Sequence, residues 1–449
     1  MARSLLILPV FLVALYSCNV NGQYAYFDDF AGQKFCATRE RTPEGTCCSN
    51  RVDECSVPIA GTLCYCDEFC DKHINPDCCP DYESFCKGAP PPITKVCSIG
   101  DIHIRPFEEI KVNCNLCKCS GNSTVTCEED VCLSDVNVIN DINRNAASLG
   151  WKAYNYTEFY GKKLKEGLTY RLGTFEPRVK VKSMSRLGHS TEQLPQNFNS
   201  LTKWTGFISE IHDQGWCGSS WAVSTASVGS DRISINTKEV VDLASQHLLS
   251  CVRHQQGCTG GHLDNAWRYL NRLGVADEDC YPYEATVGRC RAKKNDNLRT
   301  MQCNLPSTQR ESLYKMGPAY SLNNETDIMW EIFHYGPVQA TMWVYPDLFT
   351  YRSGIYRKSS FGDQHAKGFH SVRLVGWGEE SNGFQRAKYW IAAQSWGKWW
   401  GENGFFRIAR GNNECGIEEY VLSAMADQHD RKNARRARSH QKTMSRNRA

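Results

Sequence analysis

The distribution of cysteine constrains the fold of this 449-residue chain more than any other feature. Of its 24 cysteines, ten lie between Cys36 and Cys86, six between Cys97 and Cys132, and seven from Cys217 onward. Disulfides do not persist in a reducing compartment, so unless these cysteines bind metals, their number argues against a cytosolic protein. The cysteine-free stretch before Cys217 separates small cross-linked segments from a larger C-terminal domain.

The N-terminus has the pattern of a secretory signal peptide. Arg3 precedes an apolar run over residues 5–16, which is too short to span a bilayer, and small residues follow at 20–22. We therefore expect residues 1–22 to be removed and the chain to be secreted to the extracellular space or matrix. No later apolar run predicts a transmembrane segment. Loss of Cys18 leaves an odd number of cysteines, so one is free or pairs with another chain.

The net charge of +3 is concentrated at the C-terminal end. Eight Lys or Arg and no acidic residue lie between 431 and 449, so without them the formal charge falls from +3 to −5. The balance does not favour a nucleic-acid binder. The tail, 427–449, is either a solvated disordered segment or a binding site for sulfated glycosaminoglycans through Arg435, Arg436 and Arg438.

Three sequons are consistent with an exported chain. Asn122, Asn155 and Asn324 each begin an Asn-X-Ser/Thr triplet and are candidate glycosylation sites.

Two small modules precede the large domain. Residues 23–89 are too few to bury a sufficient core, so disulfides rather than zinc are expected to hold them together. The double cysteine Cys78-Cys79 and the run 64–70 resemble a somatomedin B domain, which implies a protein-binding role in the extracellular matrix. Cys36 and Cys47 exceed the eight cysteines of that domain and are expected to form an extra bridge. Residues 90–132 resemble part of a von Willebrand factor type C module.

The region 194–426 combines helical and strand patterns. A helix is predicted after Ser220, and apolar residues at helical spacing predict another over 263–273. From 337 onward the pattern changes to strands: residues 338–344 alternate, and apolar runs near 369–378, 388–397 and 404–411 end in glycines. This order predicts an α+β protein of two lobes with a cleft between them. The polar segment 133–193 has no sign of a core of its own.

The motifs CGSSWA, SDRI, FHSVRLVGWG and GFFRIARGNNECGIE resemble the papain family of cysteine peptidases, and its cathepsin B branch most closely. The whole layout resembles the tubulointerstitial nephritis antigen family. This resemblance implies a two-lobed papain-like fold with 133–193 as a pro-region-like segment.

The resemblance also assigns an active-site frame in which two positions are changed. Ser220 stands where the family has its nucleophilic cysteine, and Gln394 where it has an asparagine. His370 matches the catalytic histidine and Gln214 the oxyanion-binding glutamine. A helix dipole and an imidazole can ionise a thiol but not the serine hydroxyl, which is far less acidic. We therefore expect the peptidase-like domain to be inactive.

The same resemblance implies the surroundings of the site. Gly260, Gly261, Trp396 and Tyr420 are expected to line a peptide-binding groove, with Tyr420 replacing an acidic specificity residue. Cys217 is expected to pair with Cys258 and so cannot act as the nucleophile. Among the cysteines of this domain, Cys415 is the candidate for the odd thiol. No metal or cofactor site is indicated.

These observations favour a secreted, inactive, cathepsin B-like glycoprotein that binds matrix proteins or secreted signalling proteins. The alternative is an active secreted peptidase that uses Ser220 and His370.

Overall fold

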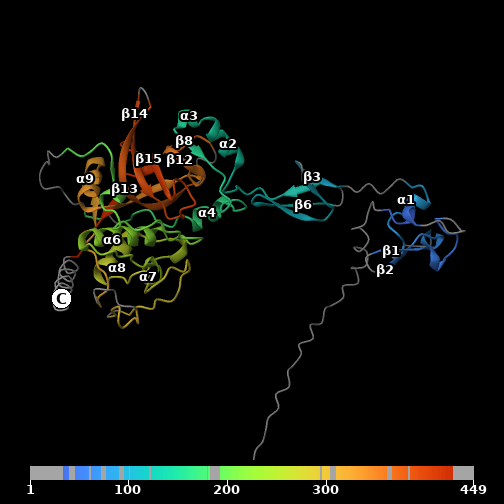
Figure 1. Cartoon of the computed structure of the whole chain (residues 1–449), viewed down its shortest axis with the longest axis horizontal. Helices are drawn as coiled ribbons and strands as arrows, with labels where there is room; N and C mark the ends of the chain where they lie inside the picture. The colour runs from blue at the N-terminus through green and yellow to red at the C-terminus, as the bar shows by residue number, and fades with distance from the viewer. Residues whose placement is uncertain are drawn as a thin grey trace, which may run out of the picture. The chain divides into compact units, whose positions relative to one another are not determined.

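The computed structural model describes residues 34–427, apart from 40–45, 60–61, 72–76, 90–95, 101, 121–122, 179–180, 183–192, 294–295, 304–309, 362–366 and 383–384. The expected signal peptide, the sequon at Asn122 and the tail with Arg435, Arg436 and Arg438 lie outside these residues. The chain forms two units (Figure 1). One comprises residues up to Glu109 and Lys118–Thr126, and the other Ile110–Cys117 and everything from Cys127 on. No helix in the described part is long and apolar enough to cross a membrane.

Half-cystines form most of the core of the first module. Buried cysteines pack there with Ile59 and Tyr82, as expected of a segment too short for an apolar core. Five disulfides connect Cys36–Cys66, Cys47–Cys86, Cys48–Cys55, Cys64–Cys79 and Cys70–Cys78. The expectation that Cys36 and Cys47 form an extra bridge is therefore wrong, because each closes a loop with a different partner.

Short elements accompany these bridges. They are the hairpin β1 (Ser56–Ile59) and β2 (Thr62–Tyr65), the 3₁₀ helices η2 (Cys36–Thr38), η3 (Asp53–Cys55) and η4 (Glu68–Asp71), and α1 (Tyr82–Cys86). The following residues form the hairpin β3 (Cys97–Ile99) and β4 (Ile102–Ile104), and a sheet of β5 (Glu109–Val112), β6 (Asn115–Cys119) and β7 (Val125–Cys127). Disulfides join Cys97–Cys119, Cys114–Cys132 and Cys117–Cys127.

A nine-stranded sheet is the centre of the larger unit. Its order is β10-β16-β11-β13-β14-β15-β12-β8, with β9 pairing with β13. The strands are β8 (Trp151–Ala153), β9 (Phe198–Asn199), β10 (Tyr320–Leu322), β11 (Val338–Val344), β12 (Tyr351–Tyr356), β13 (Gly368–Asn382), β14 (Gln385–Ala393), β15 (Phe405–Ala409) and β16 (Val421–Ser423). The strand predictions from 338 onward are confirmed. Edge strand β8, antiparallel to β12, comes from the segment before residue 194.

Helices and 3₁₀ turns complete this unit. They are α2 (Val136–Arg144), α3 (Ala146–Leu149), α4 (Leu164–Tyr170), α5 (Ser200–Lys203), α6 (Ser220–Thr237), α7 (Ser245–Cys251), η5 (Gly257–Thr259), α8 (Leu263–Arg272), α9 (Glu325–Tyr335), η6 (Pro346–Thr350) and η7 (Glu414–Gly416). The helix predictions after Ser220 and over 263–273 are confirmed.

Two apolar cores lie on either side of α6. One core contains residues of α6, α7 and α8, and the other fills the sheet. Figure 1 shows these three helices gathered on one side of the unit and the strands on the other. Because α6 contacts α7 and α8 as well as β11 and β13, it is buried along nearly all its length. The predicted α+β, two-lobed papain-like fold is confirmed, and Ser220 stands at the junction of its lobes.

Candidate active site

Ser220 is the first residue of α6 and is fully buried. The turn that precedes it is fixed by the disulfide between Cys217 and Cys258 and by the amide of Gly218, which donates to the Cys258 carbonyl at 2.6 Å. A Cβ on Gly218 would lie 2.5 Å from that carbonyl oxygen, so this turn requires glycine. The first amides of a helix have no partner within it, and the Ser220 N–H is therefore available to a hydrogen-bond acceptor outside the helix.

The acceptor is a carbonyl of the chain itself. Ser220 N–H donates to the carbonyl oxygen of Leu172 (3.3 Å), and the Gln214 side-chain amide donates to the same oxygen (2.9 Å). The Gln214 oxygen accepts from the Ser395 hydroxyl at 2.6 Å, which fixes the orientation of the amide. Two donors that converge on one carbonyl oxygen are the arrangement that stabilises an oxyanion in acyl transfer. Here this position is taken by Leu172.

His370 lies on β13, opposite Met342 of β11, and is fully buried. Its Nε2 is hydrogen-bonded to the Gln394 side-chain oxygen, which also accepts from the Ser395 amide at 3.0 Å. Because an amide oxygen only accepts, Nε2 carries the imidazole proton. Burial lowers the pKa of His370 to about 4, against the smaller opposing effect of the bond to Gln394, so the ring is neutral near pH 7.

The base and the hydroxyl are not connected. His370 Nδ1 is buried and has no hydrogen-bond partner among the described residues. The Ser220 hydroxyl is instead 2.8 Å from the hydroxyl of Thr174. General-base catalysis requires the base to reach the proton that it removes, and the described site lacks that contact.

The groove beside Ser220 is occupied by residues 171–175, which we call the groove segment. Thr174 pairs in parallel with Gly261, whose amide donates to Gly173 and whose carbonyl accepts from Phe175 (2.9 and 2.8 Å). Phe175 covers Gly260, where a Cβ would lie 2.4 Å from the ring. Gly261 therefore binds backbone in the groove, Gly260 leaves room for the Phe175 ring, and the backbone that Gly261 binds belongs to this chain.

Of the two aromatic residues expected in the groove, Trp396 is buried and Tyr420 is partly exposed. Trp396 is fully buried, stacks on Phe349 with ring centroids 4.8 Å apart, and donates its indole N–H to the Arg171 carbonyl at 2.6 Å. Tyr420 lines a pocket of about 500 Å³ together with Trp343 and Phe369. Glu176, Pro177 and Val181 form part of the same pocket, so the residues that follow the groove segment contribute to its wall.

Arg171 anchors the start of the groove segment and was not singled out from the sequence. Its guanidinium donates to Asp213 at 2.8 Å and lies over the rings of Trp216 and Trp399, 4.9 and 5.5 Å from their centroids. The side chain is only 5% exposed. No periodicity or motif marks residues 171–175, because most of their partners lie about 40 to 225 positions away in the sequence.

The remaining candidate residues lie away from this site. Asn324 is exposed and caps α9, since its side-chain oxygen accepts from the Asp327 amide at 2.9 Å. Asn155 is half-buried and accepts from the Ser134 hydroxyl at 2.6 Å. Cys415 is the only cysteine without a disulfide in the described part of the chain. Burial, with the nearby acidic groups of Glu414 and Asp347, raises the pKa of its thiol.

Comparisons with known proteins show the family to which this chain is similar. The sequence profile of the papain family cysteine proteases matches residues 194–425. The chain is 42% identical over 420 residues to tubulointerstitial nephritis antigen-like of Mus musculus, covering 87% of this chain and 88% of that one. It is 40% identical over 410 residues to human tubulointerstitial nephritis antigen, covering 84% and 85%.

A solved structure is similar as well. It is that of proCathepsin B S9 from Trypanosoma congolense, which superposes with a TM-score of 0.56 at 32% identity and covers 66% of this chain and 99% of that chain.

Proposed function

This chain belongs to the papain family of cysteine proteases, in its tubulointerstitial nephritis antigen branch, and we propose that it is a secreted glycoprotein without proteolytic activity. In this proposal it binds extracellular matrix proteins or secreted signalling proteins. Its papain-like domain then serves as a stable scaffold rather than as an enzyme.

The main support is the Leu172 carbonyl between the Ser220 and Gln214 donors. A substrate carbonyl needs the same two donors, so hydrolysis requires the groove segment to leave first. The chemistry gives independent support. No thiol stands at the start of α6, Cys217 is held in a disulfide, and His370 does not contact the Ser220 hydroxyl in the described structure.

A closed groove directs recognition to other surfaces. We propose that the disulfide-rich modules before residue 133 bind protein partners and that the basic tail binds sulfated glycosaminoglycans. The disulfides fit an oxidising compartment, as expected for the extracellular space. Asn155 and Asn324, with Asn122, are the proposed glycosylation sites.

Capture of extracellular partners tests the proposal. Full-length protein, residues 23–132 and residues 133–449, each expressed through a secretory pathway, are compared as baits against a defined panel of purified matrix and signalling proteins. We expect the full-length protein and the 23–132 modules to bind the same partner. Binding by residues 133–449 alone would contradict the assignment of recognition to the modules.

The alternative enzyme, acting through Ser220 and His370, predicts something different. Its substrate would have to displace the groove segment and bring the Ser220 hydroxyl to His370. Turnover of a peptide substrate that disappears in the variant His370→Ala would support it.

A further inference from the structure

We infer that Ser220 is a docking group for the groove segment: its hydroxyl proton is donated to Thr174, which closes a ring of hydrogen bonds that holds the segment in the groove. The inference rests on the proposed function, since it treats the segment as a permanent part of the molecule. It assigns a role to the residue that replaces the nucleophile, beyond the loss of catalysis.

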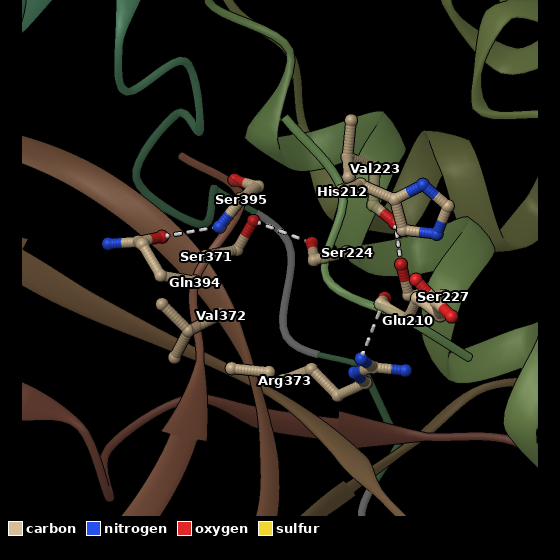
Figure 2. Close-up of a pocket in the computed structure, with 11 residues that line it drawn as sticks. Glu210, His212, Val223, Ser224, Ser227, Ser371, Val372, Arg373, Gln394 and Ser395 are labelled. Atoms are coloured by element: carbon tan, nitrogen blue, oxygen red, sulfur yellow. Dashed lines mark hydrogen bonds between the residues drawn. The ribbon is translucent and has the colours of Figure 1, made fainter. Parts of the chain in front are cut away.

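Four hydroxyl groups from three parts of the chain meet at this point. Thr174 Oγ1 lies 2.8 Å from Ser220 Oγ and 2.7 Å from Ser371 Oγ. Ser371 on β13 lies 2.8 Å from Ser224 on α6, and Figure 2 shows these two hydroxyls facing each other. Each of the four residues is at most 4% exposed, so water does not compete for these bonds.

Counting protons fixes the direction of every bond. The Ser224 hydroxyl lies 2.6 Å from the Ser220 backbone carbonyl, which can only accept, so Ser224 donates there. Ser224 also accepts from the Gln339 amide. Having no further proton, Ser224 must accept from Ser371, and Ser371 must in turn accept from Thr174. Thr174 then accepts from Ser220, so the ring begins and ends on Ser220.

Two consequences follow for the residue types. The proton of the Ser220 hydroxyl points to Thr174 and not to His370, which is consistent with the unpartnered Nδ1 of His370. A cysteine in this position would be a weak donor, and its thiol would not complete the ring. Serine at 220 and threonine at 174 therefore complement each other as hydrogen-bond donor and acceptor, although they lie 46 residues apart in the sequence.

Hydrogen exchange on the full-length protein measures opening of the groove segment. The reporters are the amides of Phe175 and Gly261, which bond across the groove. We expect Ser220→Ala and Thr174→Val each to speed exchange of both amides about tenfold, because each removes the hydrogen bond between α6 and the groove segment. Ser220→Ala leaves Thr174 without its donor, and Thr174→Val leaves the Ser220 hydroxyl without its acceptor. Exchange of the two amides in the double variant should be little faster than in either single variant, since each substitution alone already breaks the ring.

Two further variants control the experiment. Thr174→Ser keeps the hydroxyl and should retain nearly the exchange rate of the natural chain, so the contrast with Thr174→Val stands even if Ser220→Ala does not fold. Ser227→Ala removes a buried α6 hydroxyl whose one hydrogen bond among the described residues goes to the Val223 carbonyl, and it should leave both amides unchanged.

The result that overturns the inference is exchange in Ser220→Ala and Thr174→Val no faster than in Ser227→Ala. Fully independent effects of the two substitutions would overturn it as well. Peptidase assays on the same samples separate this failure from failure of the proposed function, because turnover by the natural chain would contradict the proposed inactivity.

Discussion

A single atom distinguishes Ser220 from the thiol that papain-type chemistry uses, but the neighbouring residues differ as well. A thiolate at a helix N-terminus is stabilised by the helix dipole and by an imidazolium. His370 supplies no imidazolium near pH 7, because burial lowers its pKa to about 4. The Ser220 proton is directed to Thr174. Ser220 therefore does not donate to His370, and His370 does not carry the positive charge that a thiolate–imidazolium pair needs.

The buried histidines predict a loss of stability in acid. Burial lowers the pKa of both His370 and His247 to about 4 in the folded protein, against about 6.5 when unfolded; Arg291 adds to the shift at His247. The unfolded chain therefore takes up protons first as the pH falls. The stability that these groups contribute is complete above pH 6.5 and is lost between pH 6.5 and 4, at about 3 kcal/mol for each histidine.

Urea unfolding at pH 7 and pH 4.5 measures this loss. Between pH 7 and pH 4.5, the free energy of unfolding of the variant His370→Gln should fall by about 2–3 kcal/mol less than that of the natural chain. The exposed His254→Asn serves as the control and should behave like the natural chain. Buried carboxyls with a raised pKa, such as Asp347, increase the stability of the folded protein as the pH falls. Comparing the variant with the natural chain cancels this contribution, because both contain the same carboxyls. An equal loss in His370→Gln would contradict the account.

At the scale of elements, contacts at both ends of the groove segment hold it in place. Backbone bonds to Gly261 and Phe369 hold its second half. Arg171 holds its first half through Asp213 and through the aromatic rings of Trp216 and Trp399. A hydrogen bond to a charged group contributes about 1.5–3 kcal/mol, more than a neutral one.

We predict that Arg171→Ala loosens the segment by about 2 kcal/mol. The readout uses the Ser220→Cys background, in which an added thiol reagent reaches position 220 only when the segment has moved away. Arg171→Ala should accelerate labelling of Cys introduced at 220 by more than tenfold. The exposed ion pair of Arg144 with Asp141 provides the control, and Arg144→Ala should change nothing. Equal labelling rates in both variants would show that Arg171 does not hold the segment.

The sequence predicted those parts of the fold that local patterns encode. Apolar spacing gave the helices α6 and α8, and alternation gave β11, although Gln339 and Thr341 on that strand prove to be buried and hydrogen-bonded. The family motifs assigned the positions of Ser220 and His370. The resemblance implies a pro-region-like segment that can lie across the groove. It does not show which residues fill the groove, because Leu172 and Thr174 carry no local pattern and their hydrogen-bond partners in the described structure are distant in the sequence.

At the scale of the whole molecule, residues 133–178 are integral to the larger unit. Strand β8 extends the main sheet, and Trp151, Tyr156 and Phe159 are buried in its core. Removing this segment would take those aromatic side chains away and expose the rings that they cover, such as Phe349 and Trp396. Burial of one large apolar side chain contributes roughly 1.5–3 kcal/mol. We therefore propose that the pro-region-like segment stays with the molecule and that its partners bind elsewhere.

The basic tail gives a separate prediction for the whole chain. If residues 431–449 bind sulfated polysaccharide, the contact is electrostatic and weakens as salt screens it. Deletion of these residues should shift elution from a heparin column to much lower salt. Elution at unchanged salt would rule out the tail and direct attention to a second basic stretch, at the end of the pro-region-like segment, with Arg178, Lys180, Lys182 and Arg186.

The most direct test of the central claim is active-site labelling of the purified full-length protein, with peptide turnover measured in parallel. Epoxides that alkylate catalytic thiols and fluorophosphonates that label activated serines are applied, and the adducts are located by mass spectrometry. We predict no adduct on Ser220 and no cleavage of peptide or protein substrates. A labelled Ser220, together with turnover that His370→Ala abolishes, would contradict the account.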